Sequence, residues 1–500
     1  MLRFNLDKKL FSMILLISLI FFLPIILSSH YYVDDLGRSI YGYSKWSENG
    51  RPLADLLFLS LSFGPQLPDI SPLPQLLALS ILSLSVYFSA KAFLTEFDGY
   101  VAAIISMVAI SSPFLLENLS YKYDAFPMSI SVLCAIIPFA FKAVKLKKQF
   151  LYCFTSVILI LCIYQASINI YIIFAILYVL NLFRLGETRN GLLSIVASIG
   201  GLGISYLIYS TFISPYFLVG SYNLRHSELA TSGINDTLTV ISRNITEFGK
   251  LISLVVTTPF IIFCVVVLTL SLIALIKISL VKCSYSKPEK IMKILVIVFS
   301  PFAVLCMITG PMMLLRDPVL SPRVLMAFGT ARFFFAVLST WAFSRTKLYK
   351  SLCGILFTVY ALYSLGVAYA YANSLNNQEK YENAIIQLMM SDLNSLGLSS
   401  YEFIAFKGGV SLSPEVRMAA KKYPIISKLI QPTINNQWVW GHTQMMHFDL
   451  DKKFQSFDYH MSLKSSLCTF ENVRNSNNYN ILIDKKSSTI VFDFTKTECK

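Results

Sequence analysis

Long apolar runs recur through the first three quarters of this chain of 500 residues, and each is close to the length of a membrane-spanning helix. A helix of about 20 apolar residues crosses the hydrocarbon core of a bilayer. With 55% hydrophobic and 14% charged residues, the chain lies outside the usual composition of soluble globular proteins. The sequence therefore predicts an all-α polytopic membrane bundle. We expect eleven transmembrane helices, at residues 10–28, 74–93, 99–116, 126–141, 150–165, 168–183, 192–213, 252–276, 291–310, 325–343 and 350–372.

Two of these predictions depend on short stretches within or beside the apolar segments. The fifth and sixth segments form one apolar stretch that is too long for a single span, and we divide it at "YQAS" (164–167) into a tight hairpin. The first segment lies near the N-terminus, where a signal peptide would lie. The "LSSHYYV" that follows it offers no small-x-small cleavage site, so we expect the segment to be retained.

The distribution of lysine and arginine between the segments predicts the orientation of the bundle. If the N-terminus is cytoplasmic, the cytoplasmic connections hold twice as many basic residues as the exterior loops, and the acidic residues show the opposite bias. Basic residues favour the cytoplasmic side. The net charge of +14 is then a consequence of topology, and we expect no nucleic-acid partner. Eleven crossings place the C-terminal tail on the exterior side.

We predict two domains. Residues 1–372 form the membrane domain, with long exterior loops at 28–73, 214–250 and 310–324. In the first loop, "LGRSIYGYSKW" has the spacing of an interfacial helix with Trp46 on its apolar side, and a second helix begins at Pro52. Residues 373–500 have the pattern of a small α/β domain, with a helix at 378–397, a strand in "YEFIAF", a helix capped by Ser413 and a hairpin in "NILIDKKSSTIVFDF".

Seven of the nine cysteines lie in or beside the predicted spans without metal-ligand spacing, which is typical of small apolar packing residues. Cys468 and Cys499 are the two cysteines of the tail. In an oxidising compartment they would form a disulfide, and the alternative is two free thiols.

Ionisable residues gather at the exterior ends of the predicted helices. Solvation at the membrane surface is the alternative explanation for each of them. The sequence contains no Gly-rich phosphate loop, CxxC, HExxH or GxSxG motif, which argues against nucleotide chemistry. The set consists of Asp34, Asp35 and Arg38, then Arg51, then Glu117, Lys122 and Asp124, then Arg225, and finally Arg316 and Arg323.

Asp34 and Asp35 follow directly after the first predicted span. A carboxylate near apolar surface has a raised pKa, which suits a general base that takes a proton from a hydroxyl. One acid could act as the base while its neighbour holds an arginine or caps the next helix. The alternative is that both are caps or solvated turn residues. Asp124 likewise precedes a predicted helix and has capping as its equal alternative.

Arg316 and Arg323 flank a proline-containing turn in "LLRDPVLSPRVL" just outside the membrane. Arginine binds phosphate through two parallel hydrogen bonds and stays charged in a partly dry site. We therefore predict that the two hold a lipid-linked phosphate, with headgroup anchoring as the alternative. Arg332 falls inside a predicted span, where a charge is costly unless it reaches the surface or faces a cavity.

An acidic pair that opens the first exterior loop of a bundle with a cytoplasmic N-terminus is the layout of the GT-C glycosyltransferases. The stretch "VDDLGRSIYGYSKWSENGRPLADLLF" (33–58) resembles the corresponding loop of the GtrII-type serotype-converting O-antigen glucosyltransferases. The later "SYKYD" (120–124) and "SPRVL" (321–325) resemble elements of that family too. The similarity covers most of residues 1–372, and in the tail it extends only to the architecture.

The resemblance implies a glucosyltransferase that uses undecaprenyl phosphate glucose to modify a sugar of lipid-linked O-antigen. It implies a multi-pass protein of the bacterial inner membrane with a periplasmic tail, and as partners a glycosyltransferase that makes the donor and a flippase. Asp34 or Asp35 would be the base, and Arg316 and Arg323 would hold the leaving phosphate. The other ionisable residues of the set would bind substrate. We assign no metal ligands, and the resemblance leaves open whether a divalent metal assists.

A transporter or flippase of lipid-linked sugars is the alternative from another class, since it too would place charges near the membrane surface. Transporters usually show internal repeats and midplane charges, and neither is a feature of this sequence. In the tail, Trp438 and Trp440 of "NNQWVWGH" could stack on the sugar rings of an acceptor or belong to the core.

Overall fold

The computed structural model describes residues 6–141, 145–230, 233–281 and 286–497. The chain forms two compact units. The first, here called the helical unit, consists of Met1–Leu27 and Tyr43–Tyr369, and the second, here called the sheet unit, consists of Ser28–Gly42 and Ala370–Lys500. The short segment after the first apolar helix therefore belongs to the same unit as the C-terminal tail.

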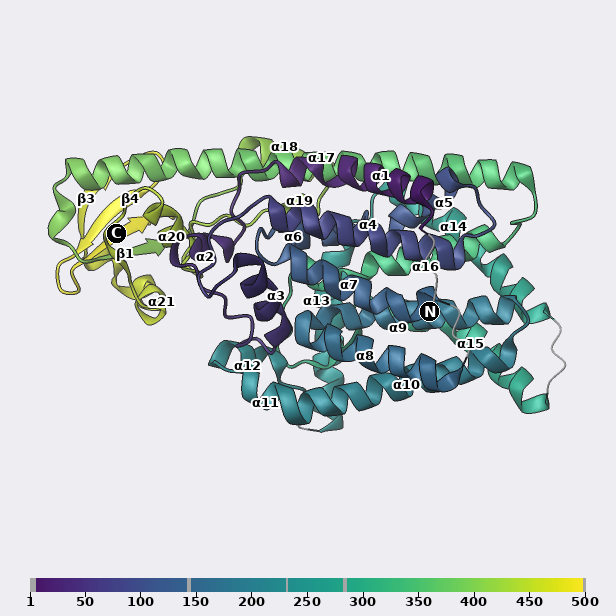
Figure 1. The fold of residues 1–500 in the computed structure, drawn as a ribbon. Coiled ribbons are helices and arrows are strands. Elements are labelled where there is room, and N and C mark those ends of the chain that lie inside the picture. The colour runs from purple at the N-terminus through teal and green to yellow at the C-terminus, as the bar shows by residue number, and fades with distance from the viewer. Residues whose placement is uncertain (1–5, 142–144, 231–232, 282–285, 498–500) are drawn as a thin grey trace. The chain divides into compact units, whose positions relative to one another are not determined.

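The helical unit is built almost entirely of α-helices, and its long members run alongside one another (Figure 1). They are α1 (Lys8–Ile26), α3 (Pro52–Ser62), α4 (Leu73–Phe93), α5 (Gly99–Ser106), α6 (Pro113–Ser120), α7 (Ala125–Ala140), α8 (Leu146–Ile163), α9 (Ile168–Arg184), α10 (Thr188–Ile208), α11 (Ser214–Phe217), α12 (Ser221–Ser227), α13 (Ile234–Ser253), α14 (Thr258–Leu280), α15 (Lys287–Cys306), α16 (Ala327–Trp341) and the first part of α17 (Lys347–Ser395). Short 3-10 helices include η1 (Met107–Ala109), η2 (Gln165–Ser167), η4 (Gly310–Leu314) and η5 (Pro322–Leu325).

Each of the eleven predicted spans overlaps a helix of this unit. Among the described residues, eight helices are long and apolar enough to cross a membrane, or nine if the pair α5/η1 and α6, bent by 75°, is one span. The other two predicted spans correspond to α7, which has 16 residues, and to α15, whose first turns are charged. The class, a polytopic helical membrane protein, is confirmed, while the number eleven and the orientation stay predictions.

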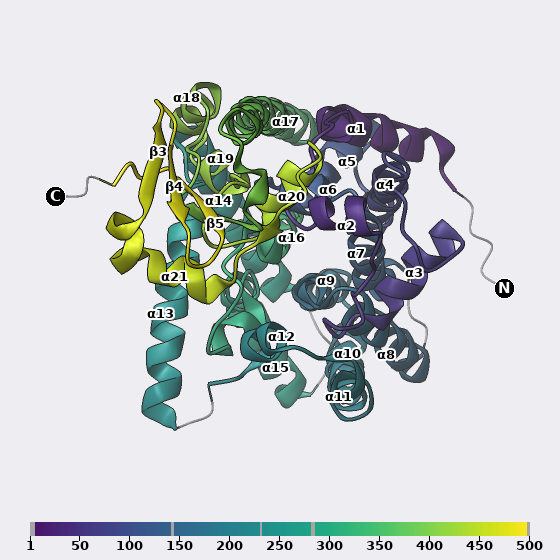
Figure 2. The same cartoon turned by 90° about the vertical axis from the view of Figure 1, so that its left-hand side faces the viewer.

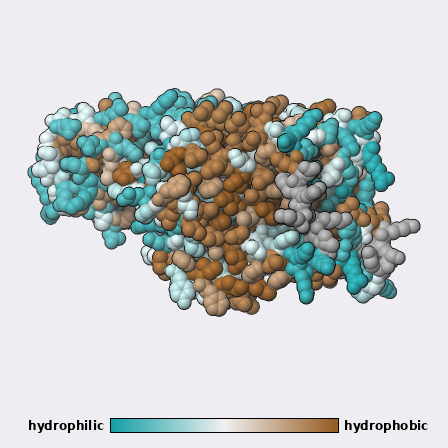
Figure 3. Space-filling model, viewed as in Figure 1, coloured by the Kyte–Doolittle hydropathy of each residue, from teal (hydrophilic) through white to brown (hydrophobic). Residues whose placement is uncertain are grey.

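Apolar side chains cover much of the surface of the helical unit, as the brown area over its helices in Figure 3 shows. They come from many different helices, and examples are Leu16 of α1, Val196 of α10, Ile262 of α14 and Val298 of α15, which are all between 58% and 63% exposed. A soluble monomer does not expose apolar area on this scale, so this surface fits contact with lipid chains.

One helix of the unit runs across the others. In Figure 2, α9 and α10 are seen end-on while α13 is seen along its length. One side of α13 is buried through Val240, Phe248 and Leu251, whereas Ile234, Leu238 and Ile245 on an adjacent stripe are 81%, 59% and 54% exposed. Polar residues occupy the remaining side. α13 is thus an amphipathic helix with an exposed apolar stripe.

The sheet unit contains a five-stranded sheet in the order β2-β1-β5-β4-β3. The strands are β1 (Phe403–Lys407), β2 (Lys453–Phe454), β3 (Glu471–Asn475), β4 (Asn480–Asp484) and β5 (Thr489–Asp493). β1 is parallel to β2 and β5, and β4 is antiparallel to β5 and β3. The helices of this unit are α2 (Asp35–Tyr41), the later part of α17, α18 (Pro414–Lys422), α19 (Ile426–Leu429), α20 (Trp440–Met446) and α21 (Phe457–Ser466).

Alternating side chains of β1 supply both faces of the sheet, as the twofold period of a strand requires. Ile404 and Phe406 pack with Ile386 and Met389 of α17 on one face. Ala405 points the other way and packs with residues of α21 such as Leu463. The sheet is therefore enclosed between α17 and α21.

Several element predictions for the tail are confirmed. The strand in "YEFIAF" and the β4–β5 hairpin are present, and the Ser413 hydroxyl accepts a hydrogen bond from the Val416 N–H as a helix cap. The helix predicted over 413–430 ends at Lys422, and the separate α19 follows it. The predicted helix at 378–397 is not a separate element. It continues the preceding span as the 49-residue α17, because the chain has no glycine or proline between Gly366 and Gly397 to end the helix.

The predicted interfacial helix of the first loop is shorter than expected. α2 ends at Gly42, which has φ of +62°, a conformation that favours glycine and ends a helix. Trp46 is consequently outside this helix and is buried within the helical unit. The predicted helix start at Pro52 is confirmed by α3.

Candidate functional site

Polar and aromatic side chains from separate segments meet at the ends of α6, α7 and α8 in the helical unit. α6 begins with a proline in its first turn and ends at Ser120, where the extended conformation of Tyr121 opens the "SYKYD" turn. η5, which contains the "SPRVL" residues, begins directly after Ser321. The contact between α6 and η5 brings the two motifs together.

Glu117 of α6 joins the two motifs. Its side chain is fully buried, and both carboxylate oxygens accept hydrogen bonds from the Ser321 hydroxyl at 2.7 and 2.9 Å. Oε2 also accepts the backbone N–H of Arg323 at 2.6 Å. A carboxylate is favoured at the first amides of a helical turn, which carry partial positive charge. Glu117 therefore fixes the position of the arginine loop.

Arg323 is half-buried and stacks on an aromatic ring. Its guanidinium lies 5.1 Å from the ring centroid of Tyr121 and donates a hydrogen bond to the Tyr121 hydroxyl. The Arg323 carbonyl accepts hydrogen bonds from the Asn118 amide at 3.3 Å and the Tyr164 hydroxyl at 3.4 Å. The guanidinium of this arginine is thus held by a neutral tyrosine, while its backbone is held by Glu117, Asn118 and Tyr164.

Arg51 stacks on the ring of Tyr164, the tyrosine whose hydroxyl donates to the Arg323 carbonyl. Its guanidinium lies 4.8 Å from the ring centroid. Its Nε donates to the side-chain oxygen of Gln165 at 3.1 Å. Burial lowers the pKa of Arg51, and the charge of Arg323 acts in the same direction, while the charge of Asp124 acts against it. Among the described residues, no carboxylate lies within ion-pair distance of either guanidinium. The two arginines therefore form a cationic pair that an anion could neutralise.

Asp124 and Asp55 organise the neighbouring loop around Trp46. The Trp46 indole N–H donates to Asp124 at 2.6 Å, and the backbone amides of Trp46 and Ser47 donate to Asp55 at 3.1 and 2.5 Å. Asp124 makes no side-chain cap hydrogen bond to α7, so its structural partner is the indole. These contacts hold the segment that carries Arg51.

The other predicted substrate-binding residues of the helical unit form ion pairs. Lys122 lies 3.9 Å from Asp69, and Arg225 lies 2.6 Å from Asp317. Arg316 pairs with Asp236 of α13 at 3.2 Å and with Glu228 at 3.5 Å. The structure thus brings Arg51 together with Arg323, whereas Arg316 and Arg225 belong to a separate, more exposed network of the α12, α13 and η4 loops.

Asp34 and Asp35 belong to the sheet unit. Asp34 precedes α2, is half-buried and makes no side-chain cap hydrogen bond. Asp35 is fully buried in the first turn of α2, and Arg38, one turn further on, is 5% exposed. Residues three apart share one side of a helix, so Asp35 and Arg38 are neighbours on the buried side of α2. The two adjacent acids thus have different environments.

α2 is held by the tail of the chain. The Tyr32 hydroxyl donates to the Leu429 carbonyl at 2.8 Å, and the Tyr31 ring stacks on His447 with a centroid separation of 5.5 Å. The Ser39 hydroxyl also contacts His447, at 3.4 Å, and α2 packs against α20. Residues of the C-terminal region therefore set the position of the acidic pair.

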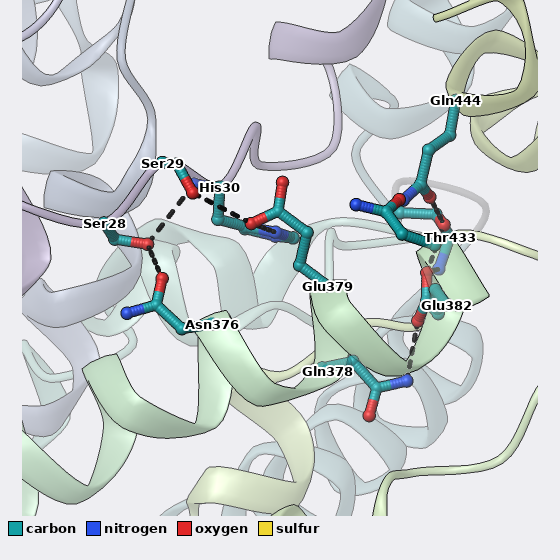
Figure 4. A network of polar contacts seen from close by, with 10 residues as sticks. Ser28, Ser29, His30, Asn376, Gln378, Glu379, Glu382, Thr433 and Gln444 are labelled. Carbon is teal, nitrogen blue, oxygen red and sulfur yellow. Dashed lines mark hydrogen bonds and ion pairs between the residues drawn. The ribbon is translucent and has the colours of Figure 1, made fainter. Parts of the chain in front are cut away.

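Figure 4 shows that α17 contacts two segments of the sheet unit, Ser28–His30 before the acidic pair and the loop at Thr433 before α20. Asn376 accepts from the Ser28 hydroxyl at 2.9 Å, and Glu379 accepts from the Ser29 hydroxyl at 3.3 Å, with His30 4.0 Å away. Further along α17, the buried Glu382 accepts from Gln378 at 2.6 Å and from the Thr433 N–H at 3.0 Å. The same stretch of α17 thus anchors the segment before the acids and the loop before α20.

Sequence reasoning missed Tyr121, Tyr164 and Gln165 as members of this site. Tyr164 and Gln165 lie in the "YQAS" interruption, and a polar break in a long apolar stretch is the signal that could have indicated them. Among the residues that the structure describes, no group of three or more histidine, cysteine or acidic side chains could hold a metal ion. Cys468 is disulfide-bonded, and Cys499, its predicted partner, lies outside the described residues.

The fold and these sites define a polytopic membrane protein with a buried polar cluster on its helical unit and an α/β unit that carries an acidic pair. Residues 23–334 match the family model described as glucosyl transferase GtrII. This match covers more than half of the chain, so the chain belongs to the GtrII glucosyltransferase family and is a glycosyltransferase, as the resemblance predicted. The matched region includes Asp34, Glu117 and Arg323.

A relative in Salmonella phage P22 is 29% identical over 474 residues, which are 93% of this chain and 95% of that protein. It is described as an uncharacterized 55.3 kDa protein in the gtrB 5' region. The similarity extends into residues 370–500 of the sheet unit, which lie outside the family model. No solved structure matches the chain.

Proposed function

We propose that this protein moves a glucosyl unit from undecaprenyl phosphate glucose to a sugar hydroxyl of lipid-linked O-antigen, at the periplasmic face of the bacterial inner membrane. Membership of the GtrII family implies O-antigen glucosylation. The observation that carries the choice of donor is the pair Arg51 and Arg323, two guanidinium groups held on tyrosine rings. A sugar linked to a lipid through one phosphate offers the anion that such a pair would bind.

The arginines would act on the leaving group. When the bond between the anomeric carbon and the phosphate oxygen breaks, the lipid phosphate leaves with the electron pair and gains negative charge. Cations positioned in advance stabilise that charge as it develops. Arg323 is the stronger candidate of the two because Glu117 fixes its backbone and Tyr121 fixes its side chain. Arg316, which we first expected beside it, is occupied by two carboxylates.

Asp34 would be the general base. Its half-buried carboxylate makes no hydrogen bond to a described residue, whereas Asp35 is enclosed beside Arg38. In the proposed reaction the acceptor hydroxyl gives its proton to Asp34 while its oxygen attacks the anomeric carbon from the side opposite the phosphate. The reaction is then an inverting displacement, and the second acid has the separate task of positioning Arg38.

The test is glucose transfer by the purified full chain in lipid nanodiscs, with radiolabelled polyprenyl phosphate glucose and lipid-linked O-antigen. We expect Asp34→Asn to lower the turnover by about 100-fold or more, since it removes the base. Arg323→Lys should raise the KM for the donor and lower the turnover, because lysine cannot reproduce the two parallel hydrogen bonds. Asp451→Asn, at a residue whose side chain is 86% exposed, is the matched control and should transfer normally.

Full transfer by Asp34→Asn would show that the base lies elsewhere. Transfer from a nucleotide sugar, with none from the lipid-linked donor, would contradict the proposed donor. If the chain moved the lipid-linked sugar across the bilayer and transferred no glucose, the flippase alternative would replace the proposal.

A further inference from the structure

Two tryptophans of the sheet unit form a stacked pair at its surface. The rings of Trp438 and Trp440 are 5.0 Å apart between centroids and 13° apart between planes. Trp438 is 38% exposed, and Trp440 is half-buried. Among the described residues, the hydrophobic clusters on the two faces of the sheet include neither indole. Of the two roles that the sequence allowed for this pair, membership of the core is therefore not the one observed.

The loop that presents the pair is tightly held. The Asn435 side chain accepts hydrogen bonds from the backbone amides of Gln437 and Trp438 at 2.9 and 3.0 Å. Below it, a Cβ atom at Gly409 would lie 2.5 Å from the Ile434 carbonyl, and one at Gly441 would lie 2.8 Å from the Ile434 Cα. These close approaches require glycine. The tryptophan pair is thus a rigid feature of the surface.

The base of the loop is part of the network in Figure 4. Thr433 donates its backbone N–H to the buried Glu382 at 3.0 Å, and its hydroxyl contacts both Glu382 and Gln444. Gln444 belongs to α20, which begins at Trp440. α20 also packs against α2, and His447, which follows α20, stacks on Tyr31 in the segment before Asp34 and Asp35. The tryptophan pair and the acidic pair are therefore carried by two helices that pack together.

The segment that carries the pair has no charged side chain of its own. The stretch from Gln431 to Met446 contains no lysine, arginine, aspartate or glutamate. Gln437 is exposed and Asn436 is half-buried, and the side-chain amides of both make no hydrogen bond to the described residues. Aromatic faces beside side-chain amides suit a ligand with apolar faces and many hydroxyl groups, and this segment provides no charged side chain for a phosphate or a charged peptide.

We propose that Trp438 and Trp440, with the amides of Asn436 and Gln437, bind the sugar chain of the acceptor. The C–H face of a pyranose ring packs on an indole face, and a planar amide can both donate to and accept from sugar hydroxyls. This inference takes its ligand class from the proposed function. It assigns acceptor recognition to the tail, beside the helix that follows the proposed base, and it makes the tail a determinant of acceptor specificity.

The distribution of tryptophan makes the binding step measurable without turnover. The chain has four tryptophans, and the other two, Trp46 and Trp341, are 1% and 7% exposed. Titration of the purified full chain in detergent with lipid-free O-antigen polysaccharide should change the intrinsic fluorescence in a saturable way and protect it from acrylamide. Trp438→Ala and Trp440→Ala should each weaken the binding at least tenfold by calorimetry. Trp438→Phe should restore part of it, and the control Trp341→Phe should bind normally.

Kinetics separate this role from a structural one. Trp438→Ala should raise the KM for the acceptor at least tenfold and leave the KM for the donor unchanged. Unchanged polysaccharide affinity in both alanine variants would overturn the inference, and so would quenching of the pair by brominated lipids with no response to polysaccharide, since it would indicate a membrane anchor. If the pair binds polysaccharide but no glucose is transferred, the proposed function fails and this inference stands. If transfer proceeds with an unchanged acceptor KM in Trp438→Ala, the inference alone fails.

Discussion

At the scale of single residues, the main finding is that Glu117 connects two sequence motifs that are about two hundred residues apart. The sequence identified Glu117, Asp124 and Arg323 as ionisable residues near the membrane surface, but it could not pair them. Which of these residues contact one another depends on which loops lie together in the folded chain. Neither composition nor helical spacing shows which loops do so. The same limit explains Arg316, whose partner Asp236 lies on a helix that we did not predict.

Replacement of Glu117 tests its role as an anchor. Glu117→Ala leaves the Arg323 N–H and the Ser321 hydroxyl without their acceptor, and we expect a loss of about 3 kcal/mol in the free energy of unfolding. Glu117→Gln should cost only about 1 kcal/mol, because its amide can still accept from Arg323 and donate to Ser321. Denaturant unfolding in micelles, followed by circular dichroism, would measure both changes.

Transfer activity should fall with Glu117→Ala as Arg323 loses its position. The control is Glu48→Ala, since the Glu48 side chain is exposed and makes no hydrogen bond or ion pair with the described residues. If Glu117→Ala kept wild-type stability and activity, the anchoring role assigned to this carboxylate would be wrong.

At the scale of elements, the apolar patterns predicted helices well and loops poorly. The break at "YQAS" was predicted from the length of the apolar stretch, the helix start from Pro52, and the strand in "YEFIAF" from its residue pattern. α13 was missed inside an exterior loop, although Ile234, Leu238 and Ile245 have helical spacing. The helix predicted in "LGRSIYGYSKW" extends past Gly42, whereas α2 ends there because the backbone turns left-handed at this glycine.

The exposed stripe of α13 predicts a position in the membrane interface. An amphipathic helix that runs across the spanning helices can bury such a stripe among lipid headgroups and the upper acyl chains. A tryptophan in place of Ile245 on the stripe should therefore show blue-shifted fluorescence that brominated lipids quench. A tryptophan in place of the adjacent Thr246, about 100° further round the helix, should show neither effect.

The four native tryptophans also fluoresce. Their signal, measured on the wild-type chain, should be subtracted from that of each variant. Equal quenching at residues 245 and 246 would argue that α13 has no preferred side toward the lipid.

At the scale of the whole molecule, stability should depend on pH through the histidines of the sheet unit. Burial lowers the pKa values of His442, His447 and His460 below the usual 6.5. His460 is fixed in its neutral form, since its Nε2 accepts the Phe406 N–H at 3.3 Å and its Nδ1 donates to the Ser456 carbonyl at 2.8 Å. Protonation would set two N–H groups against each other beside β1.

The sign of the effect follows from proton binding. Between the lowered folded pKa values and 6.5, the unfolded chain binds more protons than the folded one, so stability is full above pH 6.5 and declines as the pH falls below it. We expect amides of β1 and β5 to exchange hydrogen faster at pH 5.5 than at pH 7.5, after correction for intrinsic rates. Peptides from α9 serve as the control. Equal protection of the strands at both pH values would contradict this expectation, and His460→Gln should reduce the dependence.

The way α2 is anchored has a consequence for the order in which the protein is made. The hydrogen bonds that hold the segment around Asp34 and Asp35 join residues 348 to 408 positions apart. The ribosome therefore produces the acidic pair near the start of translation and its supporting residues near the end. A nascent chain that stopped before His447 would carry the acidic pair without all the contacts that hold it. The segment of the acidic pair therefore gains its complete set of contacts only after the ribosome has passed His447.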